Sequence, residues 1–464
     1  MVGLDSNKMH VLVRGANPWL DKHVETFIKG HVPGAVFVDD LDEIPQNATT
    51  TFQFCDGYNL NPHFGLLNAS DTSMMNAYPN SDALSRKDYL GKTIEYWAAK
   101  RPRSTLREHV PRTVHLSLDY SEYVDEALAA ADDLSLLSSL EDNEDKPASE
   151  REWWILKPAL IDCGFGIRIF STVDELASHL ELAAEIDEEE EDEVNGFSPS
   201  LSAPYLSSLD ALVTATGKIT VGGSKWQTTS QPFVISENDR IPSAQMREFV
   251  AQRYIVSVPP LDTKKWHARA YVLSVGRLKV HVFREMLALL ALKEYEPPWE
   301  NPSILSSLTN TSLQDEDEFV SNGSMREFWE IPDDLLPGDW KRSVFDQICD
   351  ISAELFQAAA HTMADKFTPL DKCFELFAVD CLIDTSGRAW LLEVNETPAF
   401  YENGYAGELA MRLMESVICV AMEHMGRVEV GDARSNVARE RMVEVLDETE
   451  KLGKSNITEI LPER

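Results

Sequence analysis

The sequence predicts an α/β fold in which short buried strands alternate with amphipathic helices. Residues 9–14 and 35–39 have the apolar pattern of buried strands, with a helical pattern over 18–30 between them. Two later segments, residues 267–285 and 374–395, alternate as strands on both sides of a short glycine-containing turn. A strand–helix–strand start and two hairpins together favour a mixed α/β architecture.

Length and composition indicate a soluble globular protein. The chain has 464 residues, 43% hydrophobic and 26% charged, which is enough for about two to four domains. No apolar run approaches the length of a membrane span, and the first residues lack the pattern of a signal peptide. The six cysteines form no CxxC pair, so we expect free thiols in a reducing, cytoplasmic compartment.

The net charge of −36 argues against nucleic acid and anionic membranes as partners. The acidic blocks at 136–152 and 185–193 are typical of solvated loops. Residues 86–112 are basic instead, which fits either a solvated helix face or a groove for an anionic peptide.

The remaining elements follow in chain order. The pattern predicts strands at 153–157, 166–170 and 249–255, and helices at 85–99, 173–182, 343–366, 406–424 and 431–452. A polar insertion of about 187–245 is expected to be flexible at its start, and 293–338 is loop-rich.

The later hairpin gathers oxygen ligands. A four-residue connection at 385–388 would set Asp380 opposite Glu393, with Asn395 on the same face. Facing carboxylates repel each other unless a cation lies between them, and this donor set suits magnesium. The alternative is a solvent-facing strand, but apolar residues share the face of Asp380. Glu375 and Asp384 are interpreted as ordinary polar positions.

The earlier hairpin gathers bases. A two-residue turn at Gly276 and Arg277 would set Arg269 against Arg284. Opposed arginines destabilise a sheet unless an anion lies between them, although pairing with Glu285 or Glu294 is the alternative. A magnesium site and an arginine clamp in one chain suggest phosphoryl chemistry.

A lysine and a glycine loop complete the set. Lys157 ends a strand before Gly164 and Gly166, an arrangement that can hold phosphates but alone is more often an ordinary turn. The order of the parts makes it informative: lysine, glycine loop, the strand with Gln252 and Arg253, the basic hairpin, and the acidic hairpin.

In these parts the chain resembles the tubulin–tyrosine ligase family of ATP-grasp enzymes. The matching segments run in family order from about residue 80 to 405. They are Leu84-Ser-Arg-Lys-Asp-Tyr-Leu90, Trp154-Ile-Leu-Lys-Pro158, Gly164-Phe-Gly-Ile167, Val250-Ala-Gln-Arg-Tyr-Ile255, Lys265-Trp-His-Ala-Arg-Ala-Tyr-Val272, Val282-Phe-Arg-Glu285, Leu308-Thr-Asn310 and Leu392-Glu-Val-Asn395.

The resemblance implies an ATP-grasp fold with two lobes that hold nucleotide between them. On this basis we expect a small Rossmann-like unit at 1–84 and a central lobe at 85–258. A carboxy-terminal lobe with the metal hairpin would span 259–428, and a charged helix and tail 429–464.

The resemblance also implies the roles of individual residues. Asp380, Glu393 and Asn395 would hold Mg²⁺ on ATP, and Arg269 and Arg284 would neutralise the γ-phosphate and the acyl-phosphate formed from it. The implied nucleotide and substrate contacts are Lys87, Lys157, Gly164, Gly166, Gln252, Arg253, Ile255, Lys265, His267, Thr309 and Asn310. His267 stands where the family usually has an acidic residue, and Cys163 where it has a basic one.

The implied activity is amide-bond formation between an amino acid and a protein carboxylate through an acyl-phosphate. A tubulin carboxy-terminal tail is the family's type acceptor, and tyrosine, glutamate and glycine remain open as the amino acid. The competing hypothesis is a non-catalytic interaction protein that keeps the fold. A protein kinase is excluded because the chain has no HRD or DFG motif.

Overall fold

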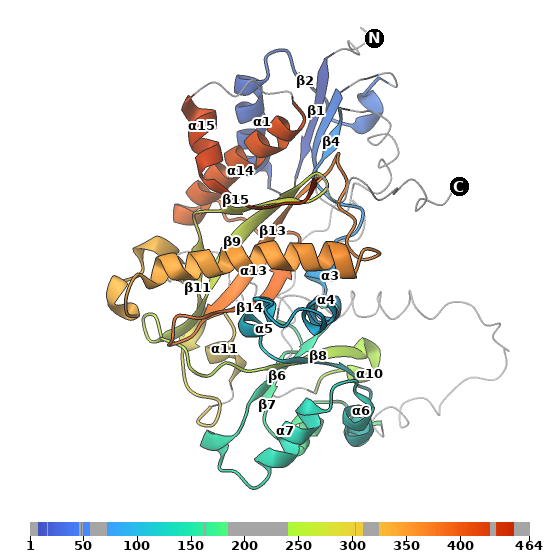
Figure 1. Ribbon diagram of the computed structural model, residues 1–464, viewed down its shortest axis with the longest axis vertical. Helices are drawn as coiled ribbons and strands as arrows, with labels where there is room; N and C mark the ends of the chain where they lie inside the picture. The colour runs from blue at the N-terminus through green and yellow to red at the C-terminus, as the bar shows by residue number, and fades with distance from the viewer. Residues whose placement is uncertain are drawn as a thin grey trace, which may run out of the picture. The chain divides into compact units, whose positions relative to one another are not determined.

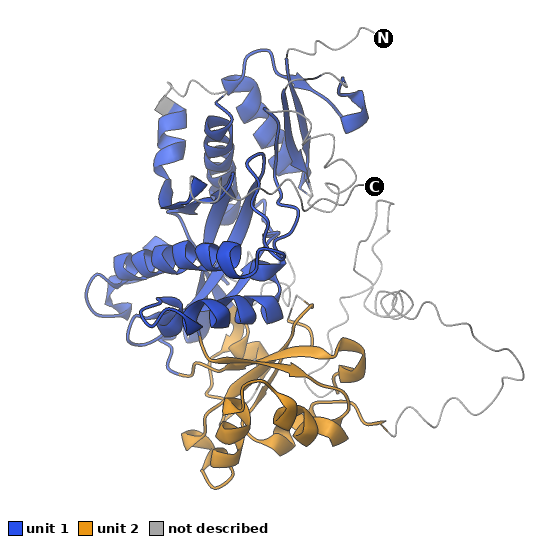
Figure 2. Cartoon of the chain, turned by 45° about the vertical axis from the view of Figure 1, so that its right-hand side comes forward, with its two compact units in different colours: residues 1–110, 257–290, 316–464 blue, residues 111–256, 291–315 orange. Residues whose placement is uncertain are grey.

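The computed structural model describes residues 8–15, 17–45, 48, 50–55, 72–161, 164–183, 240–301, 303–309, 324–426 and 433–449. The chain divides into two compact units, coloured separately in Figure 2. Unit 1 comprises Met1–Val110, Ser257–Leu290 and Glu316–Arg464, and unit 2 comprises Pro111–Val256 and Ala291–Asp315. Among the helices of the described residues, none combines the length and the apolar character that a bilayer crossing needs.

Unit 1 begins with a parallel sheet in the order β2-β1-β3-β4. Its strands are β1 (Met9–Arg14), β2 (Val36–Phe37), β3 (Thr50–Cys55) and β4 (Met74–Met75). Helix α1 (Pro18–His31) starts at a proline, which tolerates the first helical position, and buries Leu20, Val24, Phe27 and Ile28 at helical spacing. The predicted strand–helix–strand start is confirmed.

The rest of unit 1 is built on a seven-stranded sheet. Its path is β12-β11-β9-β10-β15, and β13 pairs with both β9 and β14. The strands are β9 (Lys264–Val275), β10 (Lys279–Phe283), β11 (Leu287–Glu294), β12 (Met325–Glu327), β13 (Phe374–Ile383), β14 (Ala389–Asn395) and β15 (Met442–Asp447). Strand β9 is buried along almost its whole length, because both faces of the sheet are covered.

Two long helices belong to the cores on the two faces (Figure 1). Helix α13 (Trp340–Thr362) shares a core with Ala268, Ala270 and Val272 of β9. Helix α14 (Gly404–His424) shares the other core with Tyr271 and Leu273. Odd-numbered residues of β9 therefore project toward the α14 face, which is the face that carries the candidate site.

The predicted helix at 85–99 is confirmed from Lys87 onward, and a short additional helix precedes it. Helix α3 (Asp82–Ser85) and helix α4 (Lys87–Ala99) are separated by Arg86, which has extended backbone angles. The guanidinium of Arg86 donates two hydrogen bonds to Asp88, which holds the break. Helix α5 (Leu106–His109) follows.

Unit 2 contains an antiparallel sheet in the order β5-β8-β6-β7. Its strands are β5 (Thr113–Ser117), β6 (Trp154–Pro158), β7 (Arg168–Phe170) and β8 (Glu248–Arg253). Its helices are α6 (Val124–Ala130), α7 (Ser135–Asn143), α8 (Val173–Ser178), α10 (Ser243–Met246) and α11 (Ile304–Ser307). Most of the predicted insertion lies outside the described residues, but Ile241 at its end is wholly buried in the core of this unit.

The prediction for 431–452 is wrong in its second half. Helix α15 (Ala433–Glu440) ends at Glu440, and β15 then pairs antiparallel with β10. Val443 and Val445 pack against the main core, as β-branched residues do on a sheet. The edge of β10 offers unpaired backbone groups, so tertiary pairing overrides the helical preference of the charged residues.

The expectation of free thiols is confirmed for the cysteines that the structure describes: Cys55, Cys349, Cys373, Cys381 and Cys419 form no disulfide. Cys163 lies outside the described residues.

Candidate functional site

The acidic hairpin has the predicted pairing at its functional end. Asp380 lies opposite Glu393, and Ala378 lies opposite Asn395. Directly opposed residues of an antiparallel pair share a face, so the two carboxylates and the amide project together. This part of the sequence interpretation is confirmed.

The turn reaches this register by a different route. Strand β13 ends at Ile383, one residue earlier than expected, and Asp384 joins the turn. The Asp384 carboxylate accepts hydrogen bonds from the backbone N–H groups of Ser386 and Arg388. A bulge between Asp380 and Cys381 then restores the alignment of Asp380 with Glu393. Asp384 is therefore a structural turn residue.

Asp380 is the centre of a buried polar cluster. Its side chain accepts hydrogen bonds from Arg269 Nε at 2.9 Å and from a terminal nitrogen of Arg269 at 2.7 Å. Asn395 Nδ2 donates to the same carboxylate at 3.2 Å, and His267 Nε2 lies 3.5 Å away. Asp380 and Arg269 are only 1% and 8% exposed, so the two-fold contact is shielded from water.

Electrostatics favour the charged forms of this pair. Burial alone would raise the pKa of Asp380, but the neighbouring Arg269 and His267 hold it well below its usual range. Burial would likewise lower the pKa of Arg269, and Asp380 raises it above its ordinary value. The pair therefore stays ionised across the physiological pH range.

Two further bases lie along the same face of β9. Lys265 and His267 alternate in step with Arg269, and both are buried. His267 lies opposite Leu382, next to the Asp380 pair. The structure thus gathers Lys265, His267 and Arg269 in a row beside the acidic hairpin.

The predicted arginine clamp is wrong in its register. Val275 pairs with Lys279, so the turn contains Gly276, Arg277 and Leu278 instead of two residues. Gly276 and Leu278 both have positive φ, and Leu278 is fully buried. Because the partner of every β10 residue moves by one position, Arg284 no longer falls opposite Arg269.

Tertiary contacts explain this longer turn. The backbone N–H of Gly276 donates to the carbonyl of Cys373, and the Tyr78 hydroxyl donates to the carbonyl of Gly276. Sequence periodicity within the hairpin contains no information about either partner.

Arg284 is exposed and is held by the carboxy-terminal segment. Its Nε donates to the carbonyl of Glu440 at 3.0 Å, and its backbone N–H donates to the carbonyl of Arg441 at 2.8 Å. The neighbouring Glu285 accepts hydrogen bonds from Arg412. The acid that pairs with Arg269 is Asp380, not the Glu285 or Glu294 considered as the alternative.

In unit 2, Lys157 and Gln252 are brought together. Lys157 is 7% exposed, and its Nζ donates to Gln252 Oε1 at 2.8 Å. Gln252 Nε2 in turn donates to Thr113. Both side chains lie on the face of this sheet that carries Ile155, since Gln252 pairs directly with Ile155.

The two glycines of the glycine loop adopt backbone conformations with positive φ. Gly164 and Gly166 have φ of 75° and 69°, a region that favours glycine. A Cβ on Gly166 would lie 2.9 Å from Pro158 Cγ.

The other residues with an implied role in nucleotide binding lie on several different elements. Arg253 forms an ion pair with Glu152 at 2.8 Å, and Ile255 is half-buried. Thr309 is buried, and Lys87 is the first residue of α4. Asn310 lies outside the described residues.

Sequence reasoning missed Glu375. The sequence suggests an ordinary polar position, but in the structure the Glu375 residue is buried, with only 6% of its surface exposed. The available signal was its place in a strand of apolar neighbours, which a half-exposed strand would not have on both faces.

The donor atoms of the acidic hairpin fit a magnesium ion. Asp380, Glu393 and Asn395 offer only oxygen ligands, and the Asn395 amide nitrogen already donates to Asp380, which leaves its carbonyl oxygen for a metal. Arg269 engages both oxygens of Asp380, so an ion bound here would share this carboxylate with the guanidinium.

Comparison with known proteins identifies similar sequences. A family model described as "Tubulin-tyrosine ligase family" matches residues 66–428. A Schizosaccharomyces pombe protein named "Probable tubulin--tyrosine ligase C12B10.04" is 37% identical over 334 residues, 72% of this chain and 73% of that protein. The Saccharomyces cerevisiae protein "Probable tubulin--tyrosine ligase PBY1" is 28% identical over 86% of this chain, which spans half of its length.

A solved structure has the same fold. It is described as "the C-terminal domain from K. lactis Pby1, an ATP-grasp enzyme interacting with the mRNA decapping enzyme Dcp2". The TM-score is 0.63 at 24% identity, with 95% of this chain and 99% of that chain covered. The expected ATP-grasp fold is confirmed.

Proposed function

This chain belongs to the tubulin–tyrosine ligase family, and we propose that it is an ATP- and Mg²⁺-dependent ligase that joins an amino acid to a protein carboxylate. The observation that carries the proposal is the buried cluster on β9, β13 and β14. It combines a row of bases with oxygen ligands inside the family-matched region. Such a cluster suits a metal-bound triphosphate, because it offers both cations and metal-binding oxygens.

The proposed reaction has two steps. An acceptor carboxylate oxygen attacks the γ-phosphorus of ATP, and the bond to the bridging oxygen breaks to release ADP. The amine of the amino acid then attacks the acyl carbon, the C–O bond to phosphate breaks, and the amine loses a proton. The products are an amide, ADP and phosphate. Water must be excluded, because it would hydrolyse the acyl-phosphate.

We propose that the positive charge of the Arg269 guanidinium neutralises the phosphoryl group that is transferred. Its two hydrogen bonds to Asp380 fix the guanidinium before substrate binds, so little reorganisation is needed during the reaction. Lys265 would add positive charge, and His267 would add a hydrogen-bonding ring nitrogen, along the same strand. Asp380, Glu393 and Asn395 would hold Mg²⁺, which neutralises phosphate charge when bound.

The remaining contacts are also part of the proposal. Lys157, Gln252 and the loop of Gly164 and Gly166 would bind phosphates, and Lys87, Arg253, Ile255, Thr309 and Asn310 would complete the nucleotide and substrate site. Arg284 would not lie opposite Arg269. It would help to hold the carboxy-terminal segment in place, through its hydrogen bond to the carbonyl of Glu440.

The acceptor and the amino acid follow from the names of the relatives. A tubulin tail with tyrosine is the first choice, since two relatives are named probable tubulin–tyrosine ligases. Glutamate and glycine are the other candidates, since more distant relatives are named tubulin polyglutamylase and tubulin glycylase.

A second candidate function is a nucleotide-binding interaction protein without ligase activity. The observation that favours it concerns the protein of the related solved structure: K. lactis Pby1 is described as interacting with the mRNA decapping enzyme Dcp2. The presence of His267 in the basic row is compatible with both functions, because a neutral imidazole can still hydrogen-bond a nucleotide.

Product analysis separates the two. Purified protein is incubated with ATP, Mg²⁺, one amino acid at a time and carboxylate peptides that include a tubulin tail, and the peptides are weighed by mass spectrometry. A ligase adds one amino acid less one water, and Arg269→Lys lowers the rate at least tenfold while the exposed control Glu95→Gln does not. Mg²⁺-dependent ATP binding with no product from any pair would favour the interaction protein.

A further inference from the structure

A tyrosine on β9, Tyr271, belongs to the candidate site but has no part in the reaction proposed above. It follows Arg269 by two residues, so both side chains project from the same face of the sheet. Tyr271 is only 2% exposed, and its ring packs against the ring of Phe400 with 5.9 Å between the centroids and 22° between the planes. This contact restricts the orientation of the phenol.

The strand register places Tyr271 beside the proposed metal ligands. Tyr271 lies opposite Ala378 on β13, and Ala378 lies opposite Asn395 on β14. The adjacent row on the same face contains Asp380 and its partners on the two flanking strands. Neighbouring strands are about 4.8 Å apart, so Tyr271 and Asn395 stand on either side of a residue whose side chain is a single methyl group. A ligand held by the metal ligands would therefore have Tyr271 at its side.

The hydroxyl of Tyr271 makes no hydrogen bond to any residue that the structure describes. It is not among the unpaired polar atoms that are sealed from solvent, so the small exposed area of Tyr271 includes the hydroxyl oxygen. Buried polar groups usually have a partner, and phenylalanine would fill the same space without an unpaired oxygen. Packing alone does not account for this hydroxyl.

The polar side chains around Tyr271 are already paired with one another. Arg269 donates two hydrogen bonds to Asp380, and Asn395 donates a third. The Tyr271 hydroxyl stays outside this network, although the charges of Arg269 and Asp380 both act on its pKa. It is an unused donor close to a buried ion pair.

The phenol keeps its proton at physiological pH. Burial raises the pKa of Tyr271 to about 12, Arg269 acts against this shift, and Asp380 and Tyr401 act with it. Even an unshifted phenol is protonated below about pH 10. A protonated hydroxyl can donate to an anionic oxygen, and such hydrogen bonds are stronger than those between neutral groups.

We propose that the Tyr271 hydroxyl donates a hydrogen bond to an oxygen of the terminal phosphate of ATP, beside Arg269. This inference rests on the proposed ligase function, which puts the γ-phosphate at the cluster of Arg269 and the metal ligands. Tyr271 transfers no proton, and its hydrogen bond binds and orients the phosphoryl group that is transferred. Because ADP has no γ-phosphate, the contact distinguishes the triphosphate from the diphosphate.

Calorimetric titration of the full chain with two nucleotides in the presence of Mg²⁺ tests the proposal. The probes are the β,γ-imido analogue of ATP, which has a terminal phosphate, and ADP, which does not. Tyr271→Phe should weaken binding of the analogue about tenfold, as expected for one hydrogen bond to a charged group, and should leave ADP binding unchanged. Its thermal unfolding midpoint should not fall, because the variant keeps the ring that packs on Phe400 and loses no hydrogen bond to a described residue.

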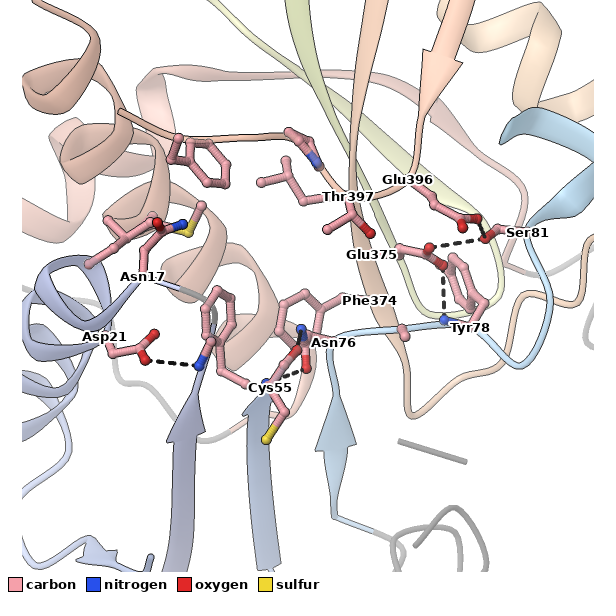
Figure 3. Close-up of a pocket in the computed structure, with 18 of the residues that line it drawn as sticks. Asn17, Asp21, Cys55, Asn76, Tyr78, Ser81, Phe374, Glu375, Glu396 and Thr397 are labelled. Atoms are coloured by element: carbon pink, nitrogen blue, oxygen red, sulfur yellow. Dashed lines mark hydrogen bonds between the residues drawn. The ribbon is translucent and has the colours of Figure 1, made fainter. Parts of the chain in front are cut away.

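Tyr78→Phe is the matched control. Tyr78 is also buried, but its hydroxyl lies 2.8 Å from Ser274 Oγ and donates to the carbonyl of Gly276 at 3.0 Å. Tyr78 lines the cavity shown in Figure 3, where its backbone N–H donates to Glu375. Removal of this hydroxyl should lower the thermal unfolding midpoint and leave the ratio of the two nucleotide affinities unchanged.

Two results would overturn the inference alone: equal affinity of the wild type and Tyr271→Phe for the analogue, or an equal loss of affinity for the analogue and ADP. A wild-type chain that binds neither nucleotide would contradict both the inference and the ligase function. A wild-type chain that binds nucleotide but joins no amino acid to any peptide would contradict the ligase function only, and the titrations would still decide the role of Tyr271.

Discussion

Asp380 has two roles: it is a proposed metal ligand, and it accepts two hydrogen bonds from Arg269. Both side chains are buried, so each charge depends on the other for compensation. The removal of one partner would leave an uncompensated buried charge, which costs more than the pair contributes in total.

Asp380→Ala should therefore destabilise the fold by about 3–5 kcal/mol. The double variant Asp380→Ala with Arg269→Met should recover a large part of this loss, because the buried charge is removed as well. Urea denaturation of the wild type, both single variants and the double variant measures the coupling. Additive losses would show that the two side chains do not act as a pair.

Glu375 predicts a pH dependence of stability with a definite sign. Its pKa is raised from the ordinary 4.5 to about 8 in the folded chain, so the folded state binds more protons than the unfolded state between these values. The stability that this group contributes is complete below about pH 4.5 and is lost as pH rises through 8.

Glu375→Gln should remove this dependence. The difference in unfolding free energy between the wild type and the variant should move against the wild type as pH rises from 5 to 9. Urea unfolding at several pH values measures it, and a difference that stays constant over this range would contradict the assignment. The variant keeps a side chain that can accept from the Tyr78 N–H.

At the scale of single elements, the two hairpins show what sequence can and cannot predict. The pairing of Asp380 with Glu393 followed from strand alternation, because the bulge and the longer turn cancel each other. The pairing of Arg269 with Arg284 did not hold, since Gly276 is fixed by Cys373 and Tyr78, which lie far away in the sequence. Strand β15 was not predicted either, because it forms by pairing with the edge of β10, which lies far away in the sequence.

The two turn glycines form a matched pair for a test. Gly276 and Gly387 both have positive φ, but a Cβ on Gly276 would collide with the His424 ring, whereas nothing lies near Gly387. Gly387→Ala should cost about 1 kcal/mol through backbone strain alone. Gly276→Ala should cost clearly more, and thermal unfolding of both variants checks this order. Equal losses would mean that His424 moves away at no cost.

At the scale of the whole molecule, the order of short motifs predicted the ATP-grasp fold better than any one motif did. The residues with implied roles divide between the two units: Lys157 and Gln252 form a hydrogen-bonded pair in unit 2, and Arg269 and Asp380 form one in unit 1. The hydrogen-bond partners of Glu375 were not predictable, since Tyr78 and Ser81 lie far from it in the sequence and only the tertiary structure brings them together.

The central claim is that a protein carboxylate is activated by phosphoryl transfer before it is joined to an amine. The most direct measurement uses an acceptor peptide labelled with ¹⁸O in its carboxylates, incubated with ATP, Mg²⁺ and the amino acid, with mass analysis of the released phosphate. Transfer through an acyl-phosphate predicts one ¹⁸O in each phosphate formed with the amide. Amide formation with unlabelled phosphate, or phosphate release without amide under every combination of substrates, would contradict it.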